Sequence, residues 1–301
     1  MAFELKHKEK VPDGIRRVVC ERIEDALKVL DGAAHKRASD EAVHEARRRF
    51  KQVRGALRLV RRELGEKQFE RENGTFRDAG RPLSEVRDAK VMVDTLDQLA
   101  GHFKGRLASG SFKQLRAALE ARRREVRKRV LDQNHATRAI VAELRKSARR
   151  VADWPFVHDG WKAIAPGLLQ IYGQGRSAMN AALRDGSDEA LHEWRKRAKY
   201  FRYGIELLNR VWPEMMEPMA DAAHHLTDLL GEDHDLAVLQ GIAENELQDG
   251  VPKEELELLE PLAAQRRTDL QKEARELGRK LYAESDDQFV SRIHGNWKAW
   301  R

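Results

Sequence analysis

One stretch of the sequence occurs twice: residues 40–54 read DEAVHEARRRFKQVR, and residues 188–202 read DEALHEWRKRAKYFR. The two copies lie 148 positions apart, nearly half of the 301-residue chain. Both keep Asp, Glu, Ala, His, Glu and three arginines, and Val43/Leu191 and Arg48/Lys196 are conservative exchanges. An internal repeat of this length indicates that the fold is built from two related halves.

A second, shorter motif follows the first in each half. Residues 83–88 read LSEVRD and residues 230–235 read LGEDHD, now at a shift of 147 positions. Two motifs that recur in the same order make chance similarity a poor explanation. The sequence therefore predicts two related helical bundles, each with a histidine- and arginine-rich helix followed by the acidic start of another helix.

The composition favours an all-α fold. Ala, Leu, Glu, Arg and Lys dominate, β-branched runs are absent, and Ser39 or Asp40 and Ser187 suit helix N-caps. Residues 65–81 are ambiguous between a short helix and a loop, and the prolines and glycine near Trp154 and Gly167 predict a linker at 152–166. The linker divides one domain, 13–301, into halves 13–151 and 167–301. The predicted helices are 13–31, 40–64, 82–100, 111–150, 167–184, 188–210, 217–230, 233–248, 253–283 and 286–299.

Charge and composition narrow the class of protein. The chain has 57 Lys and Arg against 50 Asp and Glu, a net charge of +7, and 41% hydrophobic residues, enough for a core. No apolar run approaches the roughly 20 residues that span a bilayer, and no secretory signal is evident, so we expect a cytoplasmic protein that does not enter membranes. The single cysteine, Cys20, excludes an internal disulfide and a cysteine-built zinc site.

The repeated stretch has two faces when it is placed on a helix at 100° per residue. One face is apolar, and the opposite face is cationic in both copies. We call these the first and second cationic faces: the first comprises His44, Arg47, Arg48, Lys51, Arg54, Arg58 and Arg62, and the second comprises His192, Arg195, Lys196, Lys199, Arg202 and Arg210. Like charges at this spacing repel, and few carboxylates relieve the first face, so a polyanion is the expected partner. Glu206 stands where the first copy has Arg58, which predicts weaker anion contact for the second face.

A third set of arginines recurs at a period of eleven residues. Arg116, Arg127, Arg138 and Arg149 form one stripe if residues 111–150 are a single helix, because that period drifts only about 20° per step. We expect this stripe to join the two cationic faces in a groove.

Three alternatives stay open from the residues. The aromatic residues of the first motif point to the core, leaving mainly Tyr203 on a basic face, so single-stranded nucleic acid is a weaker partner than a polymer of phosphates. A metal-dependent phosphohydrolase of HD type is suggested by His224, His225, Asp228, His234 and Asp235. The acidic segment 232–260 could also dock a basic partner or fold back on the protein's own basic surface.

The two motifs together resemble the CHAD family, the conserved-histidine α-helical domain. The resemblance rests on the paired His-x-x-Arg-[Arg/Lys]-x-x-Lys helices at His44 and His192, each followed by Leu-[Ser/Gly]-Glu-x-x-Asp, and it covers roughly 13–301. It implies two four-helix bundles related by a pseudo-two-fold axis, around a basic channel or groove that binds inorganic polyphosphate. It also implies association with polyphosphate granules.

The remaining expectations concern further domains, catalysis, cofactors and the two histidines. The chain looks like a stand-alone member without a CYTH triphosphatase domain, non-catalytic and without a cofactor. His44 and His192 could contact phosphate, support the helix or bind metal. One departure weakens the second half: His234 replaces the arginine kept as Arg87, and Ala237 stands at a following acidic position.

Overall fold

The computed structural model describes residues 3–34, 39–133 and 136–301, and within those ranges it contains helices and no strands, which confirms the all-α prediction. The elements are α1 Val11–Ala34, α2 Asp40–Leu59, α3 Arg61–His102, η1 Lys104–Arg106, α4 Lys113–Arg127, the π-helical segment η2 Lys128–Gln133, α5 Ala136–Val151, α6 Trp161–Asp185, α7 Asp188–Leu207, η3 Asn209–Val211, α8 Pro213–Glu246, α9 Lys253–Leu281 and α10 Asp286–Trp300. None of these helices is both long enough and apolar enough to cross a membrane.

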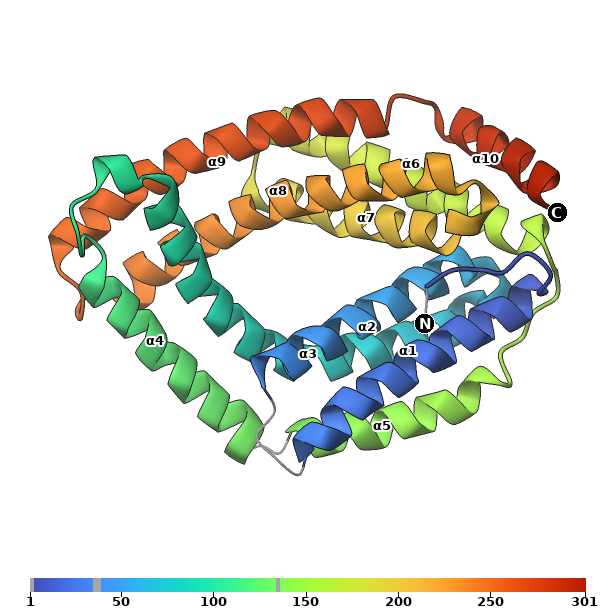
Figure 1. The fold of residues 1–301 in the computed structure, drawn as a ribbon, viewed down its shortest axis with the longest axis horizontal. Helices are drawn as coiled ribbons and strands as arrows, with labels where there is room; N and C mark the ends of the chain where they lie inside the picture. Colours follow the sequence, from blue (N-terminus) through green and yellow to red (C-terminus); the bar gives the residue numbers. More distant parts are fainter. Residues whose placement is uncertain (1–2, 35–38, 134–135) are drawn as a thin grey trace.

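The two copies of the repeated stretch form α2 and α7, which pack against each other in the middle of the molecule (Figure 1). In the first half α1 and α3 flank α2, and α5 packs on α1 and α3. In the second half α6 and α8 flank α7, and α9 packs on α8. Matching motifs therefore lie on matching helices, and the contact between the halves runs through the repeat itself.

Both central helices begin in the same way. Ser39 and Ser187 have φ/ψ of −70°/157° and −70°/156°, and their hydroxyls accept the backbone N–H of Ala42 and Ala190. Such a cap satisfies one of the amides that a helix N-terminus leaves without a partner. The predicted N-caps at Ser39 and Ser187 are thus confirmed.

Two glycines allow α2 to lie close to its neighbours α7 and α6. A Cβ atom added at Gly55 of α2 would lie 2.6 Å from the Cβ of Tyr203 on α7. One added at Gly167 of α6 would lie 1.9 Å from the carbonyl oxygen of Leu59, the last residue of α2. The end of α2 is therefore held between α6 and α7 at a separation that no side chain would permit.

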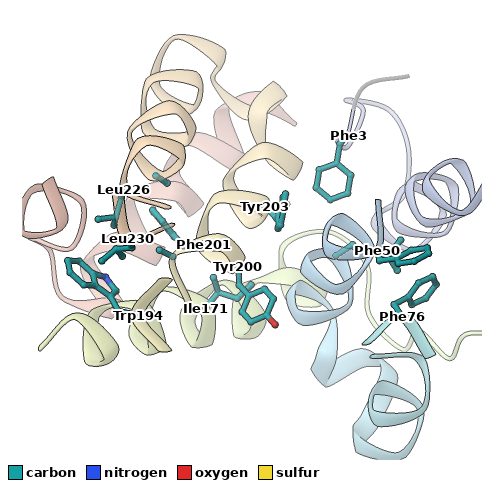
Figure 2. Close-up of a cluster of buried hydrophobic side chains, with 14 of the residues drawn as sticks. Phe3, Phe50, Phe76, Ile171, Trp194, Tyr200, Phe201, Tyr203, Leu226 and Leu230 are labelled. Atoms are coloured by element: carbon teal, nitrogen blue, oxygen red, sulfur yellow. The ribbon is translucent and has the colours of Figure 1, made fainter. Parts of the chain in front are cut away.

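The apolar core follows the faces of these helices (Figure 2). Trp194, Phe201 and Phe50 are buried, as their positions on the helical wheel predict. Phe50 lies beside Phe76 of α3, with ring centroids 6.1 Å apart. Tyr203 is also buried, with its ring edge against Phe3, so it does not lie on a basic face, contrary to the prediction.

Residues 65–81 belong to α3, and the loop reading of this segment is wrong. A kink at Gly65, with φ of +70°, is the break in the helix, and the chain then continues to His102. The polar residues that resembled a loop are buried partners of arginines: Glu72 accepts from Arg150, and Asn73 accepts from Arg54. Pairing thus allows polar residues to occupy a buried helix face.

The second motif lies within helices, not at their starts. LSEVRD is in the middle of α3, and α8 runs unbroken through LGEDHD from Pro213 to Glu246, where the sequence predicted two helices. Asp233 explains the difference, because it is buried and its carboxylate accepts from Arg267 and Gln271 of α9. An acidic residue of this kind mimics the signature of a helix start.

The linker prediction is only partly right. Residues 161–166 already belong to α6, and Trp154 is fully buried. Burial alone would raise the pKa of Glu63, but hydrogen bonds from the His158 and Val157 amides and the His158 ring hold it below its ordinary value. The connection between the halves is therefore tied to the start of α3.

Replacing Gly167 with alanine should destabilise the protein by about 1–3 kcal/mol, because the new Cβ would overlap a backbone carbonyl. Gly241→Ala is the matched control, since nothing lies within 4 Å of the added atom. As an ordinary helical glycine it should be neutral or gain up to about 1 kcal/mol. Urea unfolding of both variants measures the difference, and equal stabilities would contradict the close approach of α6 to α2.

Candidate anion-binding site

The two cationic faces meet at the contact of α2 and α7. The charged neighbours of Lys51 on α2 include Arg47 and, from α7, Arg195. Those of Lys199 on α7 include Arg195 and, from α2, Lys51 and Arg47. Corresponding residues of the two copies therefore lie within electrostatic reach of each other.

Each arginine of this group has a counter-ion from the second motif. Arg47 lies 3.4 Å from Asp88 of α3, and Arg195 lies 3.7 Å from Asp235 of α8. Gly231 brings α8 close to Arg195, whose Nη2 would lie 2.9 Å from a Cβ added there. The two repeated motifs thus belong to one site, in which the second supplies the carboxylates for the first.

We call this group the central cluster. It consists of matched residues from both halves: Arg47, Lys51, Arg87 and Asp88 from the first, and Arg195, Lys199, His234 and Asp235 from the second. Arg87, Asp88, His234 and Asp235 were not among the predicted binding residues, although the second repeated motif marked their positions.

The two lysines of the central cluster lie within electrostatic reach of Asp88 and Asp235 but form no direct ion pair in the described structure. Neither Lys51 nor Lys199 forms an ion pair or a side-chain hydrogen bond within the ranges that the structure describes. Burial, followed by the charges of Arg47 and Arg195, lowers the pKa of Lys51 to about 8. Burial and Arg195 lower the pKa of Lys199 well below its ordinary value. The site thus holds positive charge at a free-energy cost that a bound anion would remove.

His44 and His192, which begin the two cationic faces, are exposed. Partial burial and Arg87 lower the pKa of His44, and partial burial and His234 lower that of His192. The rings of His192 and His234 are 4.5 Å apart between centroids. The ligands suggested for an HD-type centre are divided among separate pairs, His224 with Asp228 and His225 with Glu273. Among the described residues no three His, Cys, Asp or Glu side chains are grouped so as to hold a metal ion.

Several residues of the cationic faces form ion pairs with neighbouring carboxylates. Arg48 lies 3.3 Å from Glu45, Lys196 pairs with Glu193, and Arg202 lies 2.6 Å from Glu206. Two of these three pairs lie on the second face, and Arg48 of the first face pairs with a glutamate of its own helix.

Arg54 and Arg58 connect three helices. Arg54 donates to Asn73 of α3 (3.0 Å) and to the Tyr200 hydroxyl of α7 (3.2 Å). The guanidinium of Arg58 lies 3.6 Å from the centroid of the Tyr200 ring, and burial lowers its pKa to about 10. Tyr200, which the sequence did not single out, therefore holds two predicted binding residues in place.

The last predicted members of each face lie beyond its helix. The predicted helix 40–64 ends at Leu59, so Arg62 lies on α3, where it is exposed. The predicted helix 188–210 ends at Leu207, so Arg210 lies in η3, where it pairs with Glu4 at 2.5 Å. The helix breaks remove both residues from the faces that a continuous helix would give them.

The predicted arginine stripe is wrong, because residues 111–150 do not form one helix. Arg116 and Arg127 lie on α4, whereas Arg138 and Arg149 lie on α5 after the π-helical segment. Arg116 forms a bidentate pair with Asp97 at 2.8 and 2.9 Å. Arg127 donates to Asp40 at the start of α2 (2.7 Å), and Arg138 is exposed. Arg116 and Arg127 thus form ion pairs that join α4 to α3 and to α2.

The acidic segment folds back on the protein's own basic helix, which was one of the expectations left open. Glu246 pairs with Arg122 of α4 at 2.8 Å, and Glu255 of α9 accepts the backbone N–H of Gln114 and Leu115. A carboxylate at a helix N-terminus is stabilised by the amides and the helix dipole. In Figure 1 this contact joins α4 to α9 on the left of the molecule.

Comparisons with known proteins agree with the arrangement. The family model described as CHAD domain matches residues 18–244. The crystal structure of the CHAD domain from the plant Ricinus communis has a similar fold, with a TM-score of 0.55 and 17% identity over 100% of this chain and 96% of that one. No curated protein matches the chain significantly.

Removing the charge of Lys51 should stabilise the free protein. Lys51→Met keeps the stem of the side chain, and we expect it to raise the free energy of unfolding at pH 7 by about 1–3 kcal/mol, at 1.36 kcal/mol per unit of pKa with a discount for solvent. Because the folded-state pKa lies below the unfolded one, wild type should gain stability between about pH 8 and pH 10.5.

Chemical denaturation of Lys51→Met across that pH range should show a smaller gain. Lys272→Met, at an exposed position on α9, is the control and should follow wild type. A destabilised Lys51→Met variant would show that the lysine is not under electrostatic strain.

Proposed function

The chain belongs to the CHAD family, and from that premise we propose that it binds inorganic polyphosphate at the central cluster, as a binding protein and not an enzyme. One observation carries the proposal: Lys51 and Lys199, from the two repeats, are within electrostatic reach of Arg47 and Arg195 and form no direct ion pair in the described structure. A chain of phosphates would supply the missing negative charge to both copies at once.

The chemistry of the side chains fits a chain of phosphates. Lysine offers a compact charge with three donors, and arginine offers a planar fork that matches phosphate oxygens. Asp88 and Asp235 hold the forks of Arg47 and Arg195 by long contacts of 3.4 and 3.7 Å. Those contacts leave donors for an incoming anion while keeping the guanidinium groups in place.

The aromatic residues favour a phosphate polymer over nucleic acid. Binding of single strands usually depends on exposed rings that stack with bases. Here Tyr203 is buried against Phe3, and Tyr200 is covered by Arg58. Recognition through phosphates alone is what remains, and we extend the proposal to association with polyphosphate granules in the cytoplasm.

Replacing both lysines with methionine, K51M/K199M, should weaken binding of long-chain polyphosphate by at least tenfold. Two lost phosphate contacts should also make the plot of log affinity against log salt shallower by about two. The control K272M/K298M removes two exposed lysines from α9 and α10. Fluorescence anisotropy of labelled polyphosphate between 50 and 300 mM salt, a range set by the steep dependence expected for phosphate contacts, measures both effects.

Competition with nucleic acids decides the ligand class. Unlabelled polyphosphate should displace the labelled polyphosphate at a lower concentration of phosphate groups than single- or double-stranded nucleic acid does. Wild-type protein that ignores polyphosphate at low salt, or a double variant that binds like its control, would refute the proposal.

Binding should be coupled to proton uptake above neutral pH. The pKa of Lys51 in the free protein is about 8, and a bound polyanion would raise it toward the ordinary value. Affinity should therefore fall as the pH rises from about 8 to 10, because the deprotonated lysine must recover its proton on binding. Isothermal titration calorimetry in two buffers of different ionisation enthalpy measures the proton uptake, which should decrease in Lys51→Met. An uptake equal to that of wild type would contradict the role of Lys51.

A further inference from the structure

A pocket between α2 and α3 adjoins the central cluster on one side. Its volume is about 250 Å³, below the roughly 300–1,000 Å³ of sites for drug-sized molecules. Its floor includes the buried rings of Phe50 and Phe76. We call it the α2–α3 pocket, and its size suits a small anionic group or a short stretch of a polymer.

The lining of the α2–α3 pocket is cationic. Five of its side chains are basic, and no acidic side chain is among the described residues that line it: Arg47, Lys51, Arg54, Arg77 and Arg81. Arg47 and Lys51 also belong to the central cluster, so the two sites are continuous. Arg77 and Arg81 lie outside the cationic faces that the sequence predicted.

The two arginines at the rim share one carboxylate. Asp78 lies 2.9 Å from Arg77 and 3.6 Å from Arg81, and both arginines are exposed. One carboxylate cannot balance two guanidinium groups, so the rim keeps a net positive charge. An anion in the pocket would meet this charge together with that of Lys51, which forms no direct ion pair in the described structure.

The second half does not repeat this chemistry. At the shift of 147 that relates α3 to α8, His224 stands in place of Arg77 and Asp228 in place of Arg81, and these two pair with each other at 2.8 Å. At the shift of 148 that relates α2 to α7, Ala198 stands in place of Phe50. The basic rim is therefore a property of the first half alone, although the central cluster is built from both halves.

We propose that the α2–α3 pocket is a second phosphate subsite, through which a bound polyphosphate chain leaves the central cluster over the first half and not over the second. This inference rests on the proposed function. The polymer is then held asymmetrically by a nearly symmetric pair of helices, with Arg77 and Arg81 as additional binding residues.

Charge removal at the rim tests the subsite. R77Q/R81Q should weaken long-chain polyphosphate binding about tenfold and make the salt dependence shallower by about two. The control K272Q/R275Q removes two exposed charges from α9 and should stay within about twofold of wild type. Binding of R77Q/R81Q equal to that of the control would overturn the inference. The proposed function would survive that result, because K51M/K199M tests it separately.

A substitution that is expected to tighten binding excludes misfolding as the reason for the weaker binding of R77Q/R81Q. Asp78→Asn frees both rim arginines and should tighten binding by about two- to fivefold. Asp228→Asn removes an exposed carboxylate from α8, at the position that corresponds to Arg81, and should leave affinity unchanged. Equal effects of the two substitutions would show a general influence of net charge and would refute a subsite.

Chemical footprinting of the wild-type protein locates the polymer directly. Bound polyphosphate should protect Arg77 and Arg81 from an arginine-selective dicarbonyl reagent, read by mass spectrometry, and should leave exposed Arg275 reactive. Reaction of all three arginines at the same rate with and without bound polymer would overturn the proposal.

Discussion

The repulsion between positive charges at the contact of α2 and α7 is the constraint on which the rest of the structure depends. Two lysines and two arginines from the two repeats lie within electrostatic reach of one another, and the protein must hold them there against the cost of burial. The close approach at Gly55 and Gly167 fixes α2 against α6 and α7 by steric fit. Packing of this kind does not depend on the charges, so the backbone can keep the cationic side chains together.

The distribution of carboxylates shows which charges the fold needs and which it leaves free. Asp40 accepts from Arg127, Glu72 accepts from Arg150, and Asp233 accepts from Arg267. Each of these pairs joins a central or flanking helix to the helix packed outside it. Lys51 and Lys199 are excluded from this scheme in the described structure. Their burial without a direct ion pair is the feature on which the proposed anion binding rests.

The sequence predicted the parts of the fold that depend on the repeat. The two motifs identified the central helices, their serine caps and their apolar faces, because helical periodicity and capping are local properties. The prediction from sequence failed where polar side chains form hydrogen bonds with residues that are distant along the chain. Asn73 and Asp233 resemble a loop residue and a helix start, yet each lies within a helix because an arginine from another helix reaches it. The arginine stripe failed for a related reason, since an eleven-residue period has meaning only on an unbroken helix.

The central cluster was predictable only in part. The cationic faces contained Arg47, Lys51, Arg195 and Lys199, but periodicity could not show that these four lie together, because which faces meet is decided by the packing of α2 on α7. The two halves then diverge around the shared centre. Arg87 corresponds to His234, whose pKa is lowered by burial and by Arg195, so a permanent charge of the first half is replaced by a titratable ring in the second. The repeated motifs thus contribute to one paired site, and the residues around it make its two sides chemically unequal. At this pair of positions, an anion bound between the halves would meet the guanidinium of Arg87 on one side and the imidazole of His234 on the other.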